Sequence, residues 1–193
     1  MTPQQVQKDT VYINFSGEIT PNPVETLIAT IGNAVNQGTK NVCLLISTPG
    51  GSVMCGLALY NVLRGFPINL TTHNVGNVDS IGNAVFLAGT QRYACPHSTF
   101  MFHGVANQFQ AQGVVSLTEK DLNERLDSVR ADQHRIGAII KDRTKLDEAT
   151  IGGLFLQAKT HDSGFALGCG IVHEIREVQI PPGVPVISLV FQR

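Results

Sequence analysis

One serine stands where a nucleophile would be useful. Ser80 follows the turn-like string Gly76–Asp79 and precedes a run of small and apolar residues, Ile81–Gly89, which predicts a helix. The N-terminus of a helix stabilises negative charge and offers free N–H donors, so a tetrahedral intermediate formed on Ser80 would find donors there. A plainer interpretation stands beside this one, because Ser and Asp are common N-cap residues.

A histidine at the end of an apolar run supplies a second reactive group. The string Cys95–Gly104 contains Ser98–Phe102, which predicts a strand, and His103 directly after it. A lone histidine in that place is more often a satisfied core or edge residue than a base. A hydrolytic serine, however, needs an imidazole within hydrogen-bond reach, and a strand that follows the serine's helix is one way to bring it there.

Two adjacent glycines follow another expected strand. Gly50 and Gly51, in the string Ile46–Val53, separate an apolar strand from a helix. Paired glycines let backbone N–H groups turn toward an anion or an oxyanion, although such turns also occur as plain connections. No Gly-Lys-Ser/Thr follows and no G-x-G-x-x-G is present, which excludes a phosphate site of the P-loop or dinucleotide type. The turn is therefore a candidate oxyanion hole.

Short apolar runs alternate with helical patterns along the chain. The runs are rich in β-branched and aromatic residues, and the segments between them carry apolar residues at helical spacing. This order predicts an α/β fold with a largely parallel sheet, because a crossover helix is the usual way to bring the next strand in parallel. The expected strands are Val11–Phe15, Val42–Ile46, Ile68–Thr72, Ser98–Phe102 and Pro185–Phe191, and the expected helices are Val24–Asn36, Val53–Arg64 and Ile81–Ala88.

A longer helix is predicted over Thr118–Arg143, where Thr118 and Asp121 form a capping-box pattern. At 1.5 Å per residue this helix would be about 37 Å long, which exceeds the width of a domain of this size. We therefore expect it to project from its domain or to pack on another subunit. Its apolar positions are Leu122, Leu126, Val129, Ile136, Ile139 and Ile140.

Composition limits the remaining function classes. The chain has 193 residues, 42% of them hydrophobic, and a net charge of −1, so we expect one domain over residues 1–193 and no electrostatic footprint for nucleic acid or an anionic membrane. The first residues lack the pattern of a signal peptide and no apolar run is long enough to span a membrane, so a cytoplasmic protein is expected. The four cysteines form no C-x-x-C pair, and we expect no metal site.

Taken together, these strings resemble the ClpP family of serine peptidases, within the wider ClpP/crotonase fold. The family's strand–Pro–Gly–Gly turn is similar to Ser47–Val53, its nucleophile motif to Ser80–Gly89, and its base motif to Pro96–His103. The long predicted helix is similar to the family's handle helix, and Ala166–Val172 is similar to its closing helix-turn-strand. The resemblance covers Val11–Ile175 and implies repeated β-β-α units with a projecting handle helix.

The resemblance implies a serine endopeptidase that acts on peptides or unfolded protein segments. It assigns Ser80 as nucleophile and His103 as general base, and it builds the oxyanion hole from the backbone N–H groups of Ile81 and of the glycine turn, at Gly51. In that mechanism His103 takes the proton of Ser80, the alkoxide attacks a peptide carbonyl, and His103 then protonates the leaving amine. No cofactor is expected.

The family's third catalytic residue has no direct counterpart. The family's aspartate aligns at or near Ala158, which has no acid. Asp162, four residues on, is the nearest carboxylate and a candidate third member of the triad, but it also stands where a helix cap is expected. Gln157 is an alternative that would orient the imidazole as a neutral amide, and a serine–histidine dyad is another.

The resemblance also implies a homo-oligomeric ring, with two rings stacked through the helix Thr118–Arg143. Ten residues precede Val11, fewer than the family's segment that contacts an unfoldase, so we do not expect an ATPase partner. The expected C-terminal strand, residues Val184–Gln192, has no counterpart in the family. Two other functions stay open, namely a crotonase-type enzyme acting on an acyl-CoA thioester and a catalytically impaired ClpP-like scaffold subunit.

Overall fold

The computed structural model describes residues 9–106, 116–189 and 191. Strands and helices alternate from β1 to α4, as the sequence predicts. The strands are β1 (Thr10–Ser16), β2 (Asn41–Thr48), β3 (Asn69–Asp79), β4 (Gln91–Ala94), β5 (Thr99–Met101), β6 (Thr160–Asp162), β7 (Glu174–Ile175) and β8 (Val186–Leu189). The helices are α2 (Pro21–Asn36), α3 (Val53–Gly65), α4 (Gly82–Phe86), α5 (Glu119–Arg143), α6 (Glu148–Gln157) and α7 (Ser163–Gly168).

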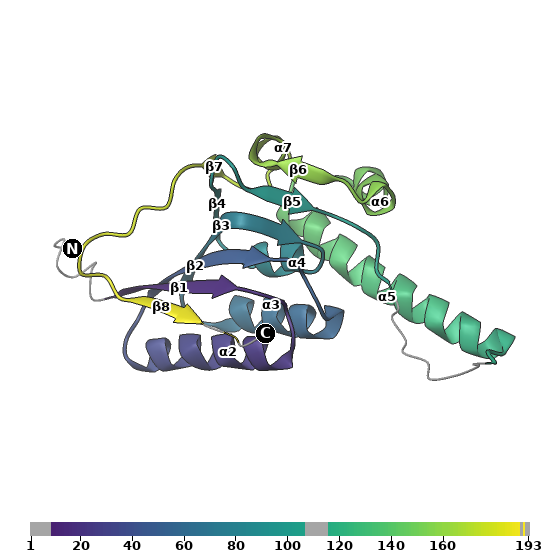
Figure 1. Cartoon of the computed structure of the whole chain (residues 1–193), viewed down its shortest axis with the longest axis horizontal. Coiled ribbons are helices and arrows are strands. Elements are labelled where there is room, and N and C mark those ends of the chain that lie inside the picture. The colour runs from purple at the N-terminus through teal and green to yellow at the C-terminus, as the bar shows by residue number, and fades with distance from the viewer. Residues whose placement is uncertain (1–8, 107–115, 190, 192–193) are drawn as a thin grey trace.

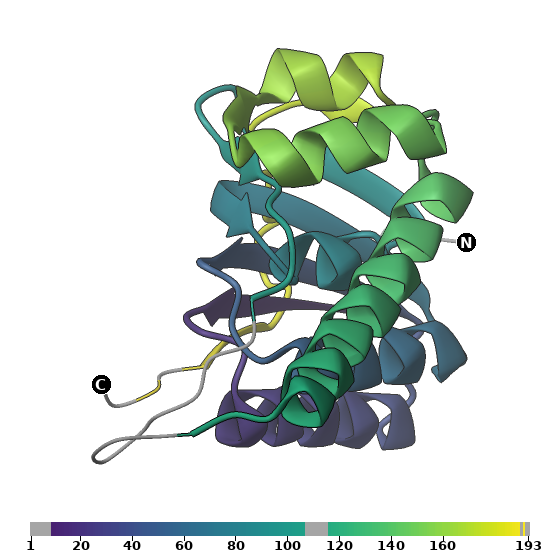
Figure 2. The ribbon, with the colours of Figure 1, turned by 90° about the vertical axis from the view of Figure 1, so that its right-hand side faces the viewer.

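One sheet runs through the centre of the molecule in the order β6-β5-β3-β2-β1-β8, and β4 pairs with both β3 and β7. Every pair is parallel except β5 with β6, which confirms the largely parallel sheet. β1, β2 and β3 point the same way, so their carboxyl ends meet at one side of the body. The helix α5 crosses that side (Figures 1 and 2). Ligands of open parallel sheets bind at this edge.

The alternation of side chains along β1 explains how the sheet is covered. Val11, Ile13 and Phe15 are buried, whereas Tyr12 and Asn14 between them are partly exposed. The buried side chains share one apolar core with the inner faces of α2, α3 and α4. The helices α2 and α3 lie below the sheet in the view of Figure 1. This packing fixes the strand ends, from which the turns of the candidate site leave.

The segment before Ser80 is a strand, whereas the sequence predicted a turn there. The turn expected over Gly76–Asp79 is wrong, because β3 continues to Asp79. Asparagine side chains take part in its hydrogen bonding: Asn74 Oδ1 accepts from Gly76 N at 3.0 Å, and Asn77 Nδ2 donates to the carbonyl of Thr48 at 3.1 Å. β3 can therefore pair first with β4 and then with β5. Only Ser80 and Ile81 separate this strand from α4.

Three short strands, β4, β6 and β7, were not predicted from the sequence. They have two to four residues and include charged or polar side chains, so neither alternation nor β-propensity marks them. The predicted C-terminal strand is confirmed over β8, which pairs in parallel with β1 at the edge of the sheet. Residues 190 and 192 of the predicted range lie outside the described residues, as do residues 1–8.

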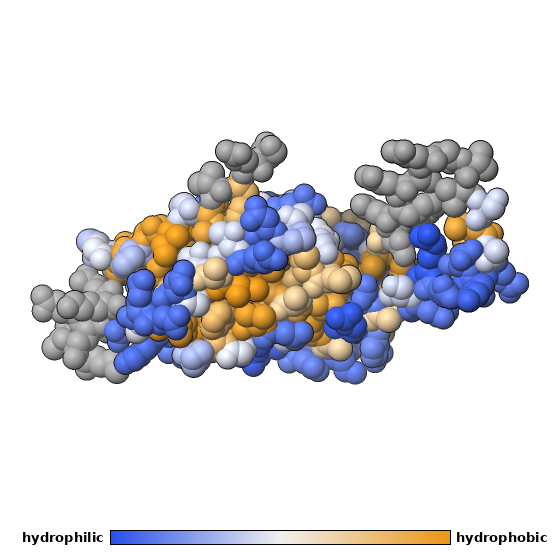
Figure 3. Space-filling model, turned by 90° about the horizontal axis from the view of Figure 1, so that it is seen from below, coloured by the Kyte–Doolittle hydropathy of each residue, from blue (hydrophilic) through white to orange (hydrophobic). Residues whose placement is uncertain are grey.

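The long helix α5 is confirmed, together with its capping box. Thr118 Oγ1 accepts from Asp121 N, and Asp121 Oδ2 accepts from Thr118 N. The inner half of α5 is packed on the body through Ile136 and Ile140, whereas Leu122 and Leu126 of the outer half are 53% and 45% exposed. The outer half leaves the body (Figure 1), and its surface is mainly hydrophilic seen from below (Figure 3). Within the described residues, no helix is both long and apolar enough to cross a membrane.

Two arginines anchor the inner end of α5. Arg92, which is 5% exposed, donates to four backbone carbonyls, and burial lowers the pKa of its guanidinium to about 10. Arg143, the last residue of α5, donates to the carbonyls of Leu87 and Gly89 just after α4. These bonds hold α5 beside the helix that follows Ser80. The acceptors of Arg92 are the carbonyls of Gly89, Arg143, Gly170 and Ile171.

Candidate active site

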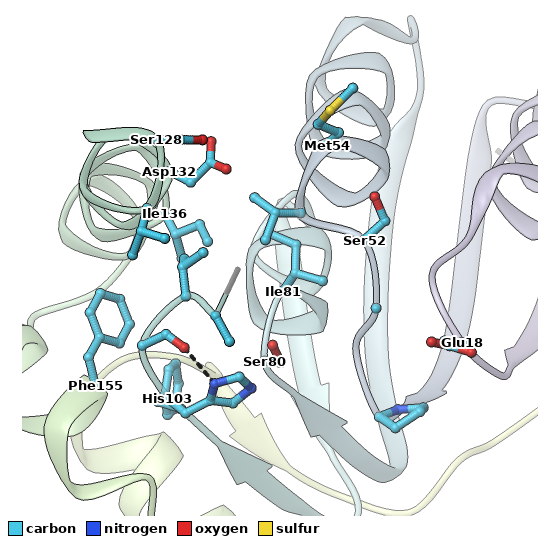
Figure 4. Close-up of a pocket in the computed structure, with 18 of the residues that line it drawn as sticks. Glu18, Ser52, Met54, Ser80, Ile81, His103, Ser128, Asp132, Ile136 and Phe155 are labelled. Atoms are coloured by element: carbon cyan, nitrogen blue, oxygen red, sulfur yellow. Dashed lines mark hydrogen bonds between the residues drawn. The ribbon is translucent and has the colours of Figure 1, made fainter. Parts of the chain in front are cut away.

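A cleft of about 710 Å³ opens at the carboxyl ends of the strands. Four of the five site residues expected from the sequence line it, namely Gly51, Ser80, Ile81 and His103. Ser80 and the ring of His103 lie beside one another on its floor, between α5 on one wall and the start of α3 on the other (Figure 4). The structure therefore brings the three separate strings of the sequence to one place. Asp162 does not line the cleft.

Ser80 lies in the tight turn between β3 and α4. Its φ of +56° is left-handed, which is uncommon for a residue with a side chain and costs about 1–3 kcal/mol. Its backbone N–H donates to the carbonyl of Met101 at 2.9 Å, which fixes the turn to β5. Gly50 packs directly on it, since a Cβ built on Gly50 would lie 2.7 Å from the Cβ of Ser80. The turn is held from both neighbouring strands, and its side chain faces the cleft.

Two backbone donors beside Ser80 are available. Within the described residues, the N–H groups of Gly51 and Ile81 have no hydrogen-bond acceptor, whereas the N–H of Gly50 donates to Thr48 Oγ1 at 3.1 Å. Gly51 has a φ of +146°, and a Cβ there would overlap the carbonyl of Ile19. The backbone at this point thus requires glycine. A pair of unpaired N–H groups next to a hydroxyl is the arrangement that stabilises an oxyanion.

His103 follows β5 by two residues and is partly exposed. Its Nδ1 lies 2.7 Å from the carbonyl oxygen of Gly104, the next residue. A carbonyl only accepts hydrogen bonds, so this contact requires the proton on Nδ1 and leaves the lone pair on Nε2. Sequence reasoning missed this contact, because no side-chain pattern signals a bond to a main-chain carbonyl. The ring can thereby present Nε2 as a proton acceptor.

Among the described residues, the group that bonds to the His103 ring is a backbone carbonyl and not a carboxylate. Within the described residues, the only hydrogen bond of the His103 ring is the one to Gly104. Asp162 caps α7, with Oδ1 accepting from the N–H of Phe165 at 2.8 Å, and it pairs with Thr99 in the β5–β6 register. Thr99 precedes His103 by four residues, which is about 13 Å along a strand. The capping role predicted for Asp162 is confirmed, and among the described residues its carboxylate makes no hydrogen bond to His103.

Ala158 and Gln157, the other two positions considered from the sequence, do not orient His103 in the described structure either. Ala158 ends α6 in a left-handed conformation, with a φ of +49°. Gln157, the neutral amide considered from the sequence, is exposed and makes no hydrogen bond to His103. A second histidine, His161, stacks on Phe165 with ring centroids 3.9 Å apart, and burial lowers the pKa of its imidazole. Among the described residues, neither Gln157 nor a carboxylate forms a hydrogen bond with the His103 ring.

The walls of the cleft were not predicted as part of a site. Ile136 and Ile140 line it from α5, and Phe155 lines it from α6. On the serine side, the buried amide of Asn83 contacts the turn. Helical spacing alone marks the two isoleucines as core residues, so no pattern of residue types indicated that they face a cleft. No group of three or more His, Cys, Asp or Glu side chains suited to a metal ion occurs in the described part of the chain.

Comparison with known proteins adds a family to this geometry. The Clp protease family model matches residues 4–179. "ATP-dependent Clp protease proteolytic subunit 2" of Chlamydia trachomatis is 34% identical over 113 residues, 53% of this chain and 56% of that protein. "ATP-dependent Clp protease proteolytic subunit 1" of Corynebacterium jeikeium is 39% identical over 67 residues, 34% of this chain and 36% of that protein. The chain thus spans about half the length or less of these curated relatives.

A solved structure confirms the fold class. The structure of a ClpP1 point mutant from Listeria monocytogenes matches with a TM-score of 0.77 and 20% sequence identity, covering 91% of this chain and 95% of that one. The ClpP-like α/β fold expected from the three strings and the long helix is therefore present. Since the family model covers most of the sequence, the chain belongs to the Clp protease family.

Proposed function

We propose that this protein is a serine endopeptidase that hydrolyses peptides or unfolded protein segments, with Ser80 as nucleophile and His103 as general base. One observation carries the proposal. The Ser80 hydroxyl lies in a cleft with two backbone N–H groups, at Gly51 and Ile81, that have no acceptor among the residues described, and with an imidazole whose Nδ1 bonds to the Gly104 carbonyl. The names of the relatives, which are proteolytic subunits, support the same reaction.

The proposed reaction proceeds in two halves. Nε2 of His103 takes the proton of Ser80 as Oγ attacks the peptide carbonyl, and the N–H groups of Gly51 and Ile81 stabilise the oxyanion that forms. The imidazolium then gives its proton to the leaving amine, the C–N bond breaks, and an acyl-enzyme remains on Ser80. Water, deprotonated by the same nitrogen, attacks the ester and releases the acid, which returns Ser80 to its starting state.

The proposed catalytic unit is a dyad. The Gly104 carbonyl holds the Nδ1 proton and so selects the tautomer that can act as a base. A neutral carbonyl stabilises the imidazolium less than a carboxylate does, so we expect slower turnover than in an enzyme with a full triad. No carboxylate of the described residues bonds to His103, which also favours a second candidate, a ClpP-like scaffold subunit with impaired catalysis. Reactivity of Ser80 separates the two.

A fluorophosphonate probe tests the proposal. We expect the wild-type protein to form one covalent adduct, mapped by peptide mass spectrometry to Ser80, and to cleave small fluorogenic peptides. Ser80→Ala should lose both the adduct and the cleavage while keeping its melting temperature, because the hydroxyl contributes little packing. A wild-type protein that is folded but unlabelled would contradict the peptidase and support the scaffold or a crotonase-type enzyme, which needs no serine–histidine pair.

The proposal includes a homo-oligomeric ring stacked on a second ring through α5. Leu122 and Leu126 on the outer half of this helix are exposed, and exposed apolar side chains in a row mark an interface. Replacing Leu126 and Val129 with Asp should split the assembly, since buried unpaired carboxylates are strongly unfavourable. Light scattering decides it: a wild-type monomer of 20.8 kDa that cleaves peptides would contradict the ring.

An ATPase partner stays a separate question. The relatives are named as subunits of ATP-dependent proteases, which favours such a partner. The sequence-based expectation against it rests on the segment before Val11, and residues 1–8 lie outside the described residues. That expectation stays a prediction, which degradation of a folded protein with and without an added unfoldase would test.

A further inference from the structure

The side chain of Asn83 is a buried polar group that the proposed mechanism leaves unused. Asn83 lies in α4, three residues after Ser80, and is 1% exposed. Its Nδ2 donates to the carbonyl oxygen of Ser80 at 3.0 Å and to that of Met101 at 2.8 Å. Met101 ends β5, two residues before His103. One NH₂ group therefore joins the turn of the proposed nucleophile to the strand that leads to the proposed base.

These two hydrogen bonds are not needed to satisfy the carbonyls. The Ser80 carbonyl also accepts from the backbone N–H of Asn83 at 3.1 Å, and the Met101 carbonyl also accepts from the N–H of Ser80 at 2.9 Å. Both oxygens would keep a partner if the amide were removed. The amide therefore adds constraint to groups that are already bonded, rather than filling a gap in the backbone.

The other end of the same amide is unsatisfied. Oδ1 of Asn83 is buried and has no hydrogen-bond partner among the described residues. A buried acceptor without a partner lowers stability, and an apolar side chain of similar size would avoid that loss. Buried polar atoms without a hydrogen-bond partner are often found at functional sites. The amide of Asn83 is placed so that its nitrogen bridges two carbonyls, and in this placement its oxygen has no hydrogen-bond partner among the described residues.

The geometry points to Asn83 as a positioning residue for peptide hydrolysis, an inference that rests on the proposed function. Ser80 has a left-handed φ of +56°, which a residue with a side chain keeps only when its surroundings restrain it. Rotation of the Ser80 peptide toward an ordinary conformation would swing its carbonyl away from Nδ2. The bond from the same nitrogen to Met101 holds this turn in register with β5. Asn83 thus keeps the Ser80 hydroxyl within hydrogen-bond reach of His103. The Asn83 side chain itself does not touch the substrate.

The rate of fluorophosphonate labelling tests this role in the full-length protein. For Asn83→Ala we expect the maximal labelling rate to fall about 10- to 100-fold, the loss typical of a reacting group displaced by about 1 Å. The concentration of probe at half-maximal rate should change less than about threefold, because the cleft walls that bind the probe are unaltered. Asn83→Asp, which keeps the volume but replaces the NH₂ with oxygen, should lose labelling rate in the same way.

Asn74 offers a matched control. It is equally buried, and its Nδ2 donates to the carbonyl of Thr99, the first residue of β5, at 2.8 Å. Asn74→Ala should lower the melting temperature but keep the maximal labelling rate within about threefold of wild type, a change too small to reflect lost alignment. Wild-type labelling on Ser80 together with equal rates in wild type and Asn83→Ala would overturn the positioning role alone.

Two further outcomes would also overturn the role of Asn83. If Asn74→Ala slows labelling as much as Asn83→Ala, the loss reflects general loosening of β5. If neither Asn83 variant folds, the amide is a folding determinant and not a positioning group. Absence of label on wild-type Ser80 would instead remove the proposed function, and the positioning role with it.

Discussion

The serine side and the histidine side of the cleft are built differently. The Ser80 turn is bonded to β5 through its N–H, packed against Gly50, and followed directly by a helix whose first residues are buried. His103 follows a three-residue strand and is partly exposed, and its ring has one hydrogen bond within the described part of the chain, to the carbonyl of its own neighbour. The proposed nucleophile is restrained by the core of the domain, whereas the proposed base is restrained by a local contact.

This difference says where the activity is most easily changed. A strained conformation such as that of Ser80 persists only where several contacts agree on it, so substitutions that disturb those contacts, such as one at Gly50, should cost both stability and activity. The contacts described for His103, the proposed base, give it no such support. Substitutions at or around His103 should have little effect on folding. The same substitutions should raise or lower turnover, depending on the side chain that is removed or introduced.

The largest effect should come from removing the base. His103→Ala should lower peptide turnover about 10²–10⁴-fold, the usual contribution of general acid–base catalysis. Stability should change little because the ring is partly exposed. Initial rates with a fluorogenic peptide and a thermal melt measure both. Turnover of the variant within about tenfold of wild type would show that another group is the base.

A smaller loss should follow from crowding the nucleophile. An alanine at Gly50 would place its Cβ 2.7 Å from the Cβ of Ser80, at a φ of +94°. We expect turnover to fall about 10- to 100-fold as the hydroxyl shifts, with a clear loss of melting temperature. Gly38→Ala is the control, since Gly38 has a φ of +92° but no atom within 4 Å of the added Cβ. Equal loss of turnover in both variants would mean that backbone strain, and not contact with Ser80, is the cause.

Residue types revealed part of what supports the serine side and nothing of what supports the His103 ring, for a physical reason. Gly50, Gly51 and the small-residue helix after Ser80 record local backbone needs, which residue types reveal directly. The left-handed φ of Ser80 left no such mark, because serine is not a residue that favours it. The support of His103 is a main-chain carbonyl, and main-chain atoms are the same at every position. Contacts of that kind follow from the path of the chain and not from residue type.

The histidine side can be sharpened by adding a carboxylate. The β5–β6 register pairs Met101 with Thr160, and Gly104 N donates to the carbonyl of Phe155 at 3.0 Å, so position 158 lies in the segment that passes His103. Ala158 has a φ of +49°, where Asp and Asn are tolerated better than alanine. Ala158→Asp should raise turnover at least about tenfold, well within the 10⁴-fold that a triad aspartate contributes. Ala158→Asn supplies the same backbone relief without charge, and equal rates in the two variants would contradict the prediction.

The smallest effect on turnover is expected at Asp162, the carboxylate nearest to that position in the sequence. Its Oδ1 accepts from the N–H of Phe165, and β5 pairing puts it beside Thr99 and away from His103. Asp162→Ala should therefore lower stability by about 0.5–2 kcal/mol, as the loss of an N-cap does, and leave turnover within about threefold of wild type. Asp147→Ala is a matched control, because Asp147 caps α6 through the N–H of Thr150 at the same 2.8 Å. Denaturant melts and peptide assays of the two variants should agree. A fall of about 10⁴-fold in turnover for Asp162→Ala alone, with unchanged melting, would show instead that His103 recruits this carboxylate as a triad partner and that the two sides of the cleft are equally supported.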